Sequence, residues 1–258
     1  MQGITMSTAP LVTLSSLPPG RKSFVDRVND LMARVTHGCA YNEKDLELVF
    51  KTRYQAYRRQ NKINDIDAEM IYDDKYDEQP NCYIIMTYID DEFISTFRIH
   101  WAKNFSQRLP SQAVFSDLID PYLREGSVVI DPTRLAARFD ASRRYPELPF
   151  LALRPAWLAA VHLEADVVLA TVAAEHAAFY KRVFGYEALC SPRAYPLLLF
   201  PVVCMALNFQ QARSNVESSY PFFKSTERER DILFGPSPTA SHCKSGFDPH
   251  ARRLANGS

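Results

Sequence analysis

Residues 127–140, which read S-V-V-I-D-P-T-R-L-A-A-R-F-D, constrain the fold more than any other stretch of this chain. The first four predict a buried strand, and Asp131 and Arg134 follow inside the same apolar element. Burying a charge costs free energy unless the charge is paired or used. Two charges of opposite sign therefore indicate either a salt-bridged pair at a strand end or a functional site. A carboxylate can accept a proton, and a guanidinium can hold an anion with a planar fork of donors.

The hydrophobic periodicity on both sides of this stretch predicts alternating helices and strands. Asn42 begins one of the helices and Gly185 ends another. A tight turn at Asp90 and Asp91 joins the first two strands. Residues 166–172 form an unbroken apolar run, which is typical of a sheet centre. This order predicts an α/β fold in which a mixed central sheet is flanked by helices, an αβα sandwich. We expect helices at residues 24–35, 41–60, 145–165 and 173–186, strands at 82–88, 93–101, 127–139, 166–172 and 195–208, and a helical or looped link at 105–123.

The composition excludes several classes of protein. The 30 basic and 30 acidic residues give a formal net charge of +0, whereas a duplex nucleic-acid binder usually has a basic surplus, so no nucleic-acid partner is expected. Five scattered cysteines without C-x-x-C or Cys/His ligand spacing favour free thiols in a reducing cytoplasm and no metal site. No apolar run approaches the ~20 residues that a membrane span requires.

The two ends of the chain read differently from its middle. Residues 1–22 predict a disordered leader and residues 225–258 a flexible tail, of which residues 236–258 are rich in Ser, Pro, Gly and Arg. A single domain is expected over residues 23–224. The polar face of the helix at 24–35 has mixed charge, which favours packing on the core over binding to a membrane. A peripheral membrane contact stays open as a partner.

The segment from the apolar strand at 167–172 through the helix that follows reads V-V-L-A-T-V-A-A-E-H-A-A-F-Y-K-R-V-F-G-Y. It resembles the last strand–helix unit of N-acyltransferases of the GNAT fold. In that unit, an aromatic residue and a tyrosine are followed by polar residues, then by glycine and a further aromatic residue. The resemblance implies an acyl-transfer enzyme.

A set of charged residues makes the resemblance more specific. Arg53 and Tyr57 on one helix are followed by the D-x-Y-D segment of Asp74, Tyr76 and Asp77, by Arg98 in F-R-I, and by Asp131 and Arg134. This order is similar to the charged signature of acyl-homoserine lactone synthases and of their relatives, the long-chain N-acyl amino acid synthases such as acyl-tyrosine synthase. The resemblance covers residues 50 to 208 and implies that Arg53, Tyr57, Asp74, Asp77 and Arg98 bind substrate.

Two departures favour the amino-acid acylating branch. The lactone synthases have a tryptophan after the helix that carries the first arginine, in the region that binds S-adenosylmethionine. The corresponding place here is near Ile63, and the two tryptophans of this chain are Trp101 and Trp157. The strand acid is usually glutamate in the lactone synthases and is Asp131 here.

The resemblance also implies roles in the reaction, which is attack of an amine on an acyl thioester. The catalytic residues that it implies are Asp131, Arg134 and Tyr180. Asp131 accepts the amine proton through a water, backbone N–H groups bind the oxyanion, and Tyr180 donates a proton to the leaving sulfur. Tyr180 can equally be a packing aromatic, and Arg53 a snorkelling side chain. Arg98 and Arg134 either pair with Asp74, Asp77 and Asp131 in one buried network, or one of them holds the carboxylate of the acceptor.

The acyl donor can be argued from a missing motif. Coenzyme A needs a glycine-rich turn for its pyrophosphate, but residues 136–147 read A-A-R-F-D-A-S-R-R-Y-P-E, without glycine. Acyl-phosphopantetheine on acyl carrier protein needs no such turn, and no permanently bound cofactor is expected. Arg138, Arg143 and Arg144 would then meet the acidic carrier protein, or else form a solvated basic turn.

Three functions remain under consideration. The first is an N-acyl amino acid synthase that uses acyl carrier protein and an amino acid acceptor. The second is an acyl-homoserine lactone (autoinducer) synthase that uses S-adenosylmethionine, and the third is a degenerate acyltransferase fold that acts as a binding module. Five charged positions in a plausible buried network argue against the third, because burying charge without use is costly.

Overall fold

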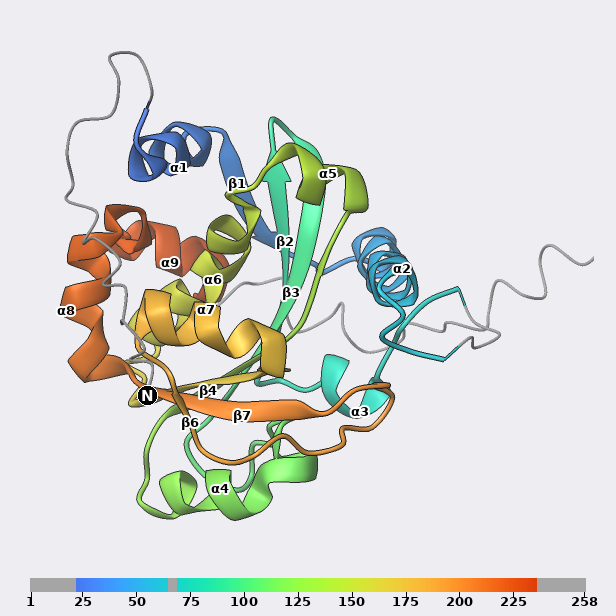
Figure 1. Ribbon diagram of the computed structural model, residues 1–258, viewed down its shortest axis with the longest axis vertical. Coiled ribbons are helices and arrows are strands. Elements are labelled where there is room, and N and C mark those ends of the chain that lie inside the picture. The colour runs from blue at the N-terminus through green and yellow to red at the C-terminus, as the bar shows by residue number, and fades with distance from the viewer. Residues whose placement is uncertain (1–21, 65–68, 236–258) are drawn as a thin grey trace, which may run out of the picture.

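The fold is a mixed sheet with helices on both faces (Figure 1). The computed structural model describes residues 22–64 and 69–235. Within them, the sheet has seven strands in the order β1-β2-β3-β4-β5-β7-β6. The expected αβα sandwich with a mixed central sheet is confirmed. The strands are β1 (Val35–Cys39), β2 (Cys82–Ile89), β3 (Glu92–Ala102), β4 (Val129–Ala137), β5 (Val167–Ala173), β6 (Glu187–Ala188) and β7 (Val202–Asn208).

The pairing of β4 with β5 is parallel and very short. Only Val129 with Val167 and Ile130 with Val168 are in register. The other neighbouring strands pair antiparallel. Beyond Ile130 the two central strands therefore diverge, and the sheet opens between them.

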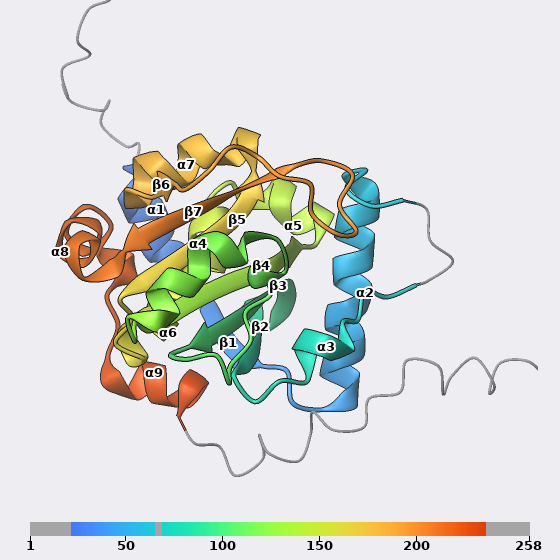
Figure 2. The same ribbon diagram turned by 90° about the horizontal axis from the view of Figure 1, so that it is seen from below.

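The helices cover both faces because the strands alternate apolar side chains between two cores. On one face, α6 and α7 share a core with Ile130 and Val168. On the other, α4 packs on Val129 and Leu169, and α2 packs on β2. Figures 1 and 2 show α7 and α4 on opposite sides of β7. The helices are α1 (Phe24–Met32), α2 (Glu43–Arg59), α3 (Asp74–Asp77), α4 (Gln112–Arg124), α5 (Phe139–Arg144), α6 (Leu148–His162), α7 (Ala174–Phe184), α8 (Phe209–Ser219) and α9 (Glu227–Phe234), with a 3₁₀ turn at Pro221–Phe223.

Several local signals act as expected. The Asn42 side chain accepts a hydrogen bond from the backbone N–H of Asp45 and so caps α2. Gly185 ends α7 with a φ of 85°, a left-handed conformation that costs glycine little. The turn between β2 and β3 places Asp90 and Asp91 at φ values of 50° and 63°, and aspartate tolerates this region better than most residues.

The N-terminal helix ends earlier than the periodicity predicts. It stops at Met32, and Val35 already begins the edge strand β1. Val28 and Leu31 of α1 are buried in the core, so this helix caps the core, as its mixed polar face suggested. Residues 1–21 of the expected leader lie outside the described part of the chain.

The ordered chain extends beyond the boundary expected at residue 225. Helix α9 follows it, and its Leu233 and Phe234 are buried. Arg154 of α6 donates to Glu229 of α9 and to the backbone carbonyl oxygens of Phe222 and Lys224. A charged segment that reads as a tail is thus held by an ion pair and two apolar anchors. Residues 236–258 lie outside the described part. In the part of the chain that the structure describes, no helix is long and apolar enough to cross a bilayer.

Candidate active site

A buried ion-pair cluster joins α2, α3 and β3. The Arg53 guanidinium donates from Nη1 to both carboxylate oxygens of Asp77, each 2.9 Å away. Arg98 Nη1 donates to the same carboxylate at 3.1 Å, and Arg98 Nε donates to the Thr133 hydroxyl at 3.0 Å. All three charged side chains are almost fully buried. The structure therefore brings three of the predicted binding residues together.

The electrostatics of the cluster follow from this pairing. Burial by itself would raise the pKa of Asp77, but the Arg53 and Arg98 guanidiniums outweigh it and hold the pKa below its ordinary value. Burial alone would lower the pKa of Arg98, and the Asp77 carboxylate reverses that effect. Asp77 therefore stays ionised between two cations.

Asp73, and not the predicted Asp74, is the second acid of this segment that contacts the arginines. Asp74 is exposed and accepts a bond from the backbone N–H of Lys75. Asp73 instead faces the cluster, with Oδ2 3.4 Å from Arg98 Nη1 and 3.7 Å from Arg134 Nη2. The expected pairing of Asp74 is corrected to Asp73, because α3 begins at residue 74 and turns Asp74 outward.

Asp131 lies apart from the arginines as well, although it is fully buried on β4. Its Oδ2 accepts from the backbone N–H of Ser111 and its Oδ1 from the Ser111 hydroxyl, both at 2.8 Å. The Ser111 hydroxyl is also 2.8 Å from the Thr171 hydroxyl of β5. A direct pair between Asp131 and Arg98 or Arg134, one of the expected arrangements, is therefore not formed in the described residues.

The environment of Asp131 sets its proton affinity. Burial raises its pKa to about 6, against the lowering effects of the two Ser111 hydrogen bonds and of the Arg98 charge. A carboxyl that titrates near neutral pH is suited to exchange protons in a reaction.

Arg134 has an unusual backbone and few partners. Its φ is 57°, a left-handed conformation that is uncommon for residues other than glycine. The β3–β4 register passes from Arg98–Thr133 to Thr96–Ala136, so Arg134 and Leu135 form a bulge opposite Phe97. The guanidinium lies 5.9 Å from the Tyr57 ring, and among the ion pairs of the described residues its one partner is Asp73, 3.7 Å away.

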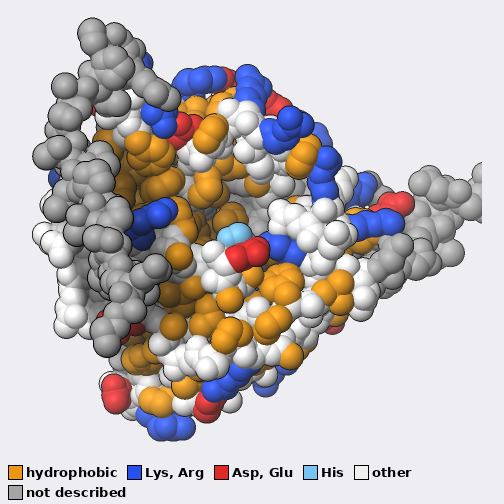
Figure 3. All heavy atoms as spheres, in the orientation of Figure 1, with side chains coloured by type: hydrophobic (Ala, Val, Ile, Leu, Met, Phe, Trp, Pro, Cys, Tyr) orange, Lys and Arg blue, Asp and Glu red, His pale blue; other side chains and the backbone are white. Residues whose placement is uncertain are grey.

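A cavity of about 210 Å³ fills the opening between β4 and β5. Arg134, Tyr57 and Tyr180 line it, together with Thr171 and Thr133. The rest of the wall is mainly apolar and comes from β4, β5, α6, α7 and the segment before β7. Figure 3 shows hydrophobic side chains gathered over β7 and the segment that precedes it. The apolar wall includes Phe97, Leu153, Ala156, Trp157, Phe184, Leu198 and Phe200.

Tyr180 of α7 borders both the cavity and a cluster of aromatic rings, and its role as a proton donor stays a prediction. It lines the cavity, and its ring packs 5.5 Å from the rings of Phe179 and Tyr186. Burial raises its pKa above the ordinary value for tyrosine, so its hydroxyl stays protonated. A protonated phenol at the cavity wall can donate a hydrogen bond or a proton.

The three arginines expected to dock a carrier protein lie at α5, outside the cavity. Arg138 is paired with Glu92 at 2.9 Å and Asp140 at 2.6 Å, and Arg144 lies 3.5 Å from Glu92. Arg143 has its guanidinium 5.7 Å from the Phe139 ring. Figure 3 shows Lys and Arg side chains gathered around α5.

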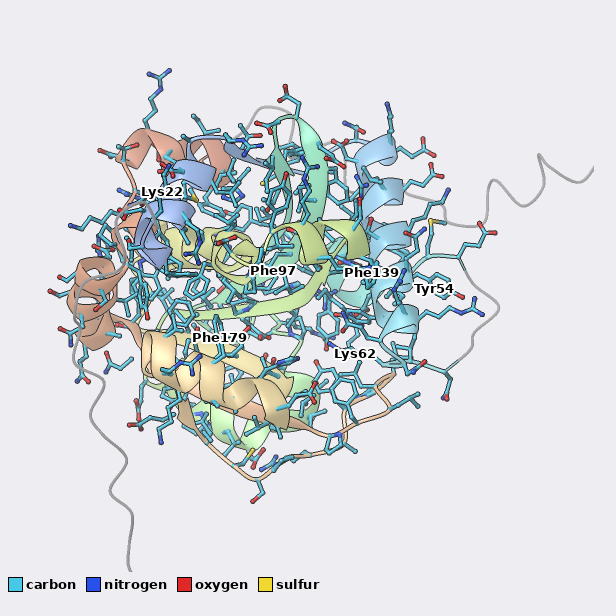
Figure 4. All side chains as sticks on the ribbon, turned by 45° about the horizontal axis from the view of Figure 1, so that its top comes forward. Lys22, Tyr54, Lys62, Phe97, Phe139 and Phe179 are labelled. Carbon is cyan, nitrogen blue, oxygen red and sulfur yellow. The ribbon has the colours of Figure 1, made fainter. Side chains whose placement is uncertain are left out.

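A further arginine extends this basic surface. The Arg59 guanidinium of α2 lies 3.1 Å from the centroid of the Phe139 ring, and Figure 4 shows Phe139 beside α2. A groove between α2 and α5 is lined by Arg58, Arg59 and Arg138. In residues 22–64 and 69–235, no group of three His, Cys, Asp or Glu side chains is arranged to hold a metal ion.

Sequence reasoning missed Asp73, Ser111 and Thr171. Asp73 stands beside the acid that was chosen, in an irregular segment without periodicity. Ser111 lies in the link before α4, where a single serine carries no signal. Thr171 is part of an apolar strand, and only its contact with the Ser111 hydroxyl distinguishes it.

The fold and site together define an N-acyltransferase of the GNAT-like type. A family model described as "N-acyl amino acid synthase FeeM" matches residues 48–208, and the chain belongs to this family. It is therefore an acyltransferase.

The solved structures that share the fold include two synthases. One is FeeM, an N-acyl amino acid synthase from uncultured soil microbes, with 14% identity and a TM-score of 0.60, covering 73% of this chain and 98% of that one. The other is the acyl-homoserine lactone synthase LasI, with 16% identity and a TM-score of 0.50, covering 67% of this chain and 89% of that one. A search of the curated proteins finds no match.

Proposed function

We propose that the protein moves a long-chain fatty acyl group from an acyl carrier protein thioester to the amino group of an amino acid. The observation that carries this proposal is the mainly apolar cavity between β4 and β5, with Arg134 as a charged group in its wall. An apolar wall suits an acyl chain and a guanidinium suits a carboxylate, so the cavity fits both substrates of such a transfer. Donor and acceptor meet where the sheet opens. A reaction with acyl carrier protein takes place in the cytoplasm.

The acceptor carboxylate binds to Arg134 in this proposal. Arg53 and Arg98 are committed to Asp77 by hydrogen bonds of 2.9 to 3.1 Å. Arg134 has only a 3.7 Å contact to Asp73 among the ion pairs of the described residues. Its guanidinium therefore retains donors for a planar carboxylate. This favours the second of the two roles that the sequence left open for these arginines.

In this proposal, the acyl-phosphopantetheine of the carrier protein enters the cavity from the side of α5. The β4–α5 turn has no glycine for a pyrophosphate, and the basic surface of Arg138, Arg143 and Arg144 suits an acidic carrier protein. Because Arg138 and Arg144 are already paired with Glu92, Arg143 contributes most of the free positive charge of the three.

The reaction follows from three groups. Asp131 takes the proton that the acceptor amine loses, backbone N–H groups at the Arg134–Leu135 bulge bind the oxyanion, and Tyr180 protonates the thiolate that leaves. The amine nitrogen forms a bond to the acyl carbon, and the carbon–sulfur bond breaks. The products are an N-acyl amino acid and the free thiol of the carrier.

Product mass tests the proposal. The purified protein is incubated with long-chain acyl carrier protein and either a mixture of amino acids or S-adenosylmethionine. We expect an N-acyl amino acid and no acyl-homoserine lactone. A lactone product would support an autoinducer synthase instead, and a lack of any product across many donors and amines would support a binding module.

A further inference from the structure

The buried position of Asp131 raises a question about the proton path. Its side chain is fully buried, and it is absent from the described residues that line the cavity. An amine in the cavity therefore has no direct contact with the carboxylate. Thr171 connects the cavity with the carboxylate. It lines the cavity and contacts Ser111, which in turn donates to Asp131.

The three side chains form one continuous chain of short contacts. Thr171 Oγ1 is 2.8 Å from Ser111 Oγ, and Ser111 Oγ is 2.8 Å from Asp131 Oδ1. Ser111 is fully buried, and its backbone N–H donates to the other carboxylate oxygen at 2.8 Å. The serine is thus held in one place by two bonds to the same carboxylate.

The direction of these hydrogen bonds follows from their chemistry. An ionised carboxylate only accepts, so the single hydroxyl hydrogen of Ser111 points to Asp131. The contact between the two hydroxyls must then be a bond from Thr171 to Ser111. Thr171 has no second hydrogen, so its oxygen can only accept from a further partner, such as an amine in the cavity that it lines.

We propose that Thr171 and Ser111 form a proton relay that carries the acceptor's proton to Asp131. This proposal rests on the proposed function. An N–H proton of the acceptor passes to Thr171 Oγ1, the Thr171 hydroxyl proton passes to Ser111 Oγ, and the Ser111 hydroxyl proton passes to Asp131 Oδ1. The nitrogen keeps its electron pair for attack on the acyl carbon. Thr171 contacts the substrate and is a catalytic residue, whereas Ser111 acts between it and Asp131.

Other titratable groups surround the carboxylate without competing for its role. Burial, with the Asp131 charge, raises the pKa of Cys204 on β7 to about 12 and raises that of Tyr195 above its ordinary value. Both stay protonated at neutral pH. Arg98 is a fixed cation, and His100, opposite Asp131 in the β3–β4 register, has Nε2 3.0 Å from the Tyr76 carbonyl oxygen.

A matched pair of substitutions at Thr171 tests the relay. Thr171→Val keeps the shape of the side chain and removes the hydroxyl, whereas Thr171→Ser keeps the hydroxyl. We expect Thr171→Val to lower kcat about 100-fold, the scale of a lost acid–base contribution. Thr171→Ser stays within a few-fold of wild type. KM for the acyl donor and the thermal midpoint stay near wild type in both.

The pH profile of kcat supplies a readout that a packing role does not move. Thr171→Val retains both Ser111 bonds to Asp131, so the rising limb stays at the same pH while the plateau falls. Ser111→Ala removes a bond that lowers the pKa of Asp131, so its limb moves to higher pH and its plateau also falls.

Two results overturn the relay, and they are distinguishable. Equal kcat values and profiles for Thr171→Val and Thr171→Ser would remove the relay and leave the proposed function in place. A wild-type protein that acylates none of the amines tested would remove both.

Discussion

The Asp77 carboxylate of α3 accepts hydrogen bonds from Arg53 of α2 and Arg98 of β3 at the same time, at distances of 2.9 and 3.1 Å. One acid thereby holds together three elements that are distant in the sequence. A buried charge that loses its partner is strongly destabilising, so this relationship gives the first prediction.

Replacing Asp77 with Asn should lower the free energy of unfolding by about 3–5 kcal/mol, because among the ion pairs of the described residues Arg53 loses its counter-charge and Arg98 keeps only the 3.4 Å contact to Asp73. Since the folded-state pKa of Asp77 lies below its ordinary value, its stabilisation is present at neutral pH and is lost as the pH falls below about 4. Denaturant titrations at several pH values measure both effects. Asp74→Asn, at an exposed site, is the control and should change stability by less than about 0.5 kcal/mol. Equal losses for the two variants would contradict the cluster.

The pH dependence of the reaction should report Asp131. The carboxyl must be ionised to accept a proton, and its pKa is raised to about 6. We therefore expect kcat to rise with pH through about 6 and then to level off. Steady-state rates from pH 4.5 to 8 with saturating donor measure this limb. Asp131→Asn should lower kcat at least about 100-fold and abolish the limb. A variant with unchanged turnover would exclude Asp131 from the proton path.

Arg134 should determine recognition of the acceptor carboxylate. Arg134→Gln removes a charge-assisted bond worth about 1.5–3 kcal/mol, so KM for the amino acid should rise roughly 10- to 100-fold. KM for the acyl donor should change little. The acceptor's amide or the matching amine without a carboxylate is the control substrate. If Arg134 binds the carboxylate, the variant and the wild type should use this control equally well.

Arg143 should contribute to carrier-protein binding. Arg143→Glu reverses a charge at α5 and should raise KM for acyl carrier protein severalfold, with a larger effect at low salt. A small acyl thioester without the protein should be used as well as by wild type. Arg182→Glu, on the exposed side of α7, is the matched control. A loss with the small thioester as well would indicate a defect in the cavity instead.

The parts of the site that lie on regular elements could be predicted from the sequence. Arg98 stands out because alternation in β3 puts it on the same face as buried Thr96 and His100. Asp131 stands out because a carboxylate follows Val129 and Ile130, two buried residues of an apolar strand. In both cases, the periodicity of the strand predicts that a charged side chain is buried.

The parts that lie on irregular segments could not be predicted. Nothing in the composition of residues 64–80 distinguishes Asp73 from Asp74, because their orientation depends on where a four-residue helix begins. Ser111 acquires its role only by contact with Asp131, 20 positions later. Tertiary packing determines the orientation of Asp73 and the contact of Ser111, and the local sequence carries no signal for either.

The ion pair between Arg154 and Glu229 of α9 has a practical consequence for recombinant work. A shortened protein that ends at residue 224 would lose Glu229, the acid that compensates this buried guanidinium. It would also uncover the side of Tyr83 that Phe234 shields, with ring centroids 5.1 Å apart. Versions made for crystallisation should therefore keep the chain at least through residue 235, since earlier truncation favours aggregation over a smaller soluble enzyme.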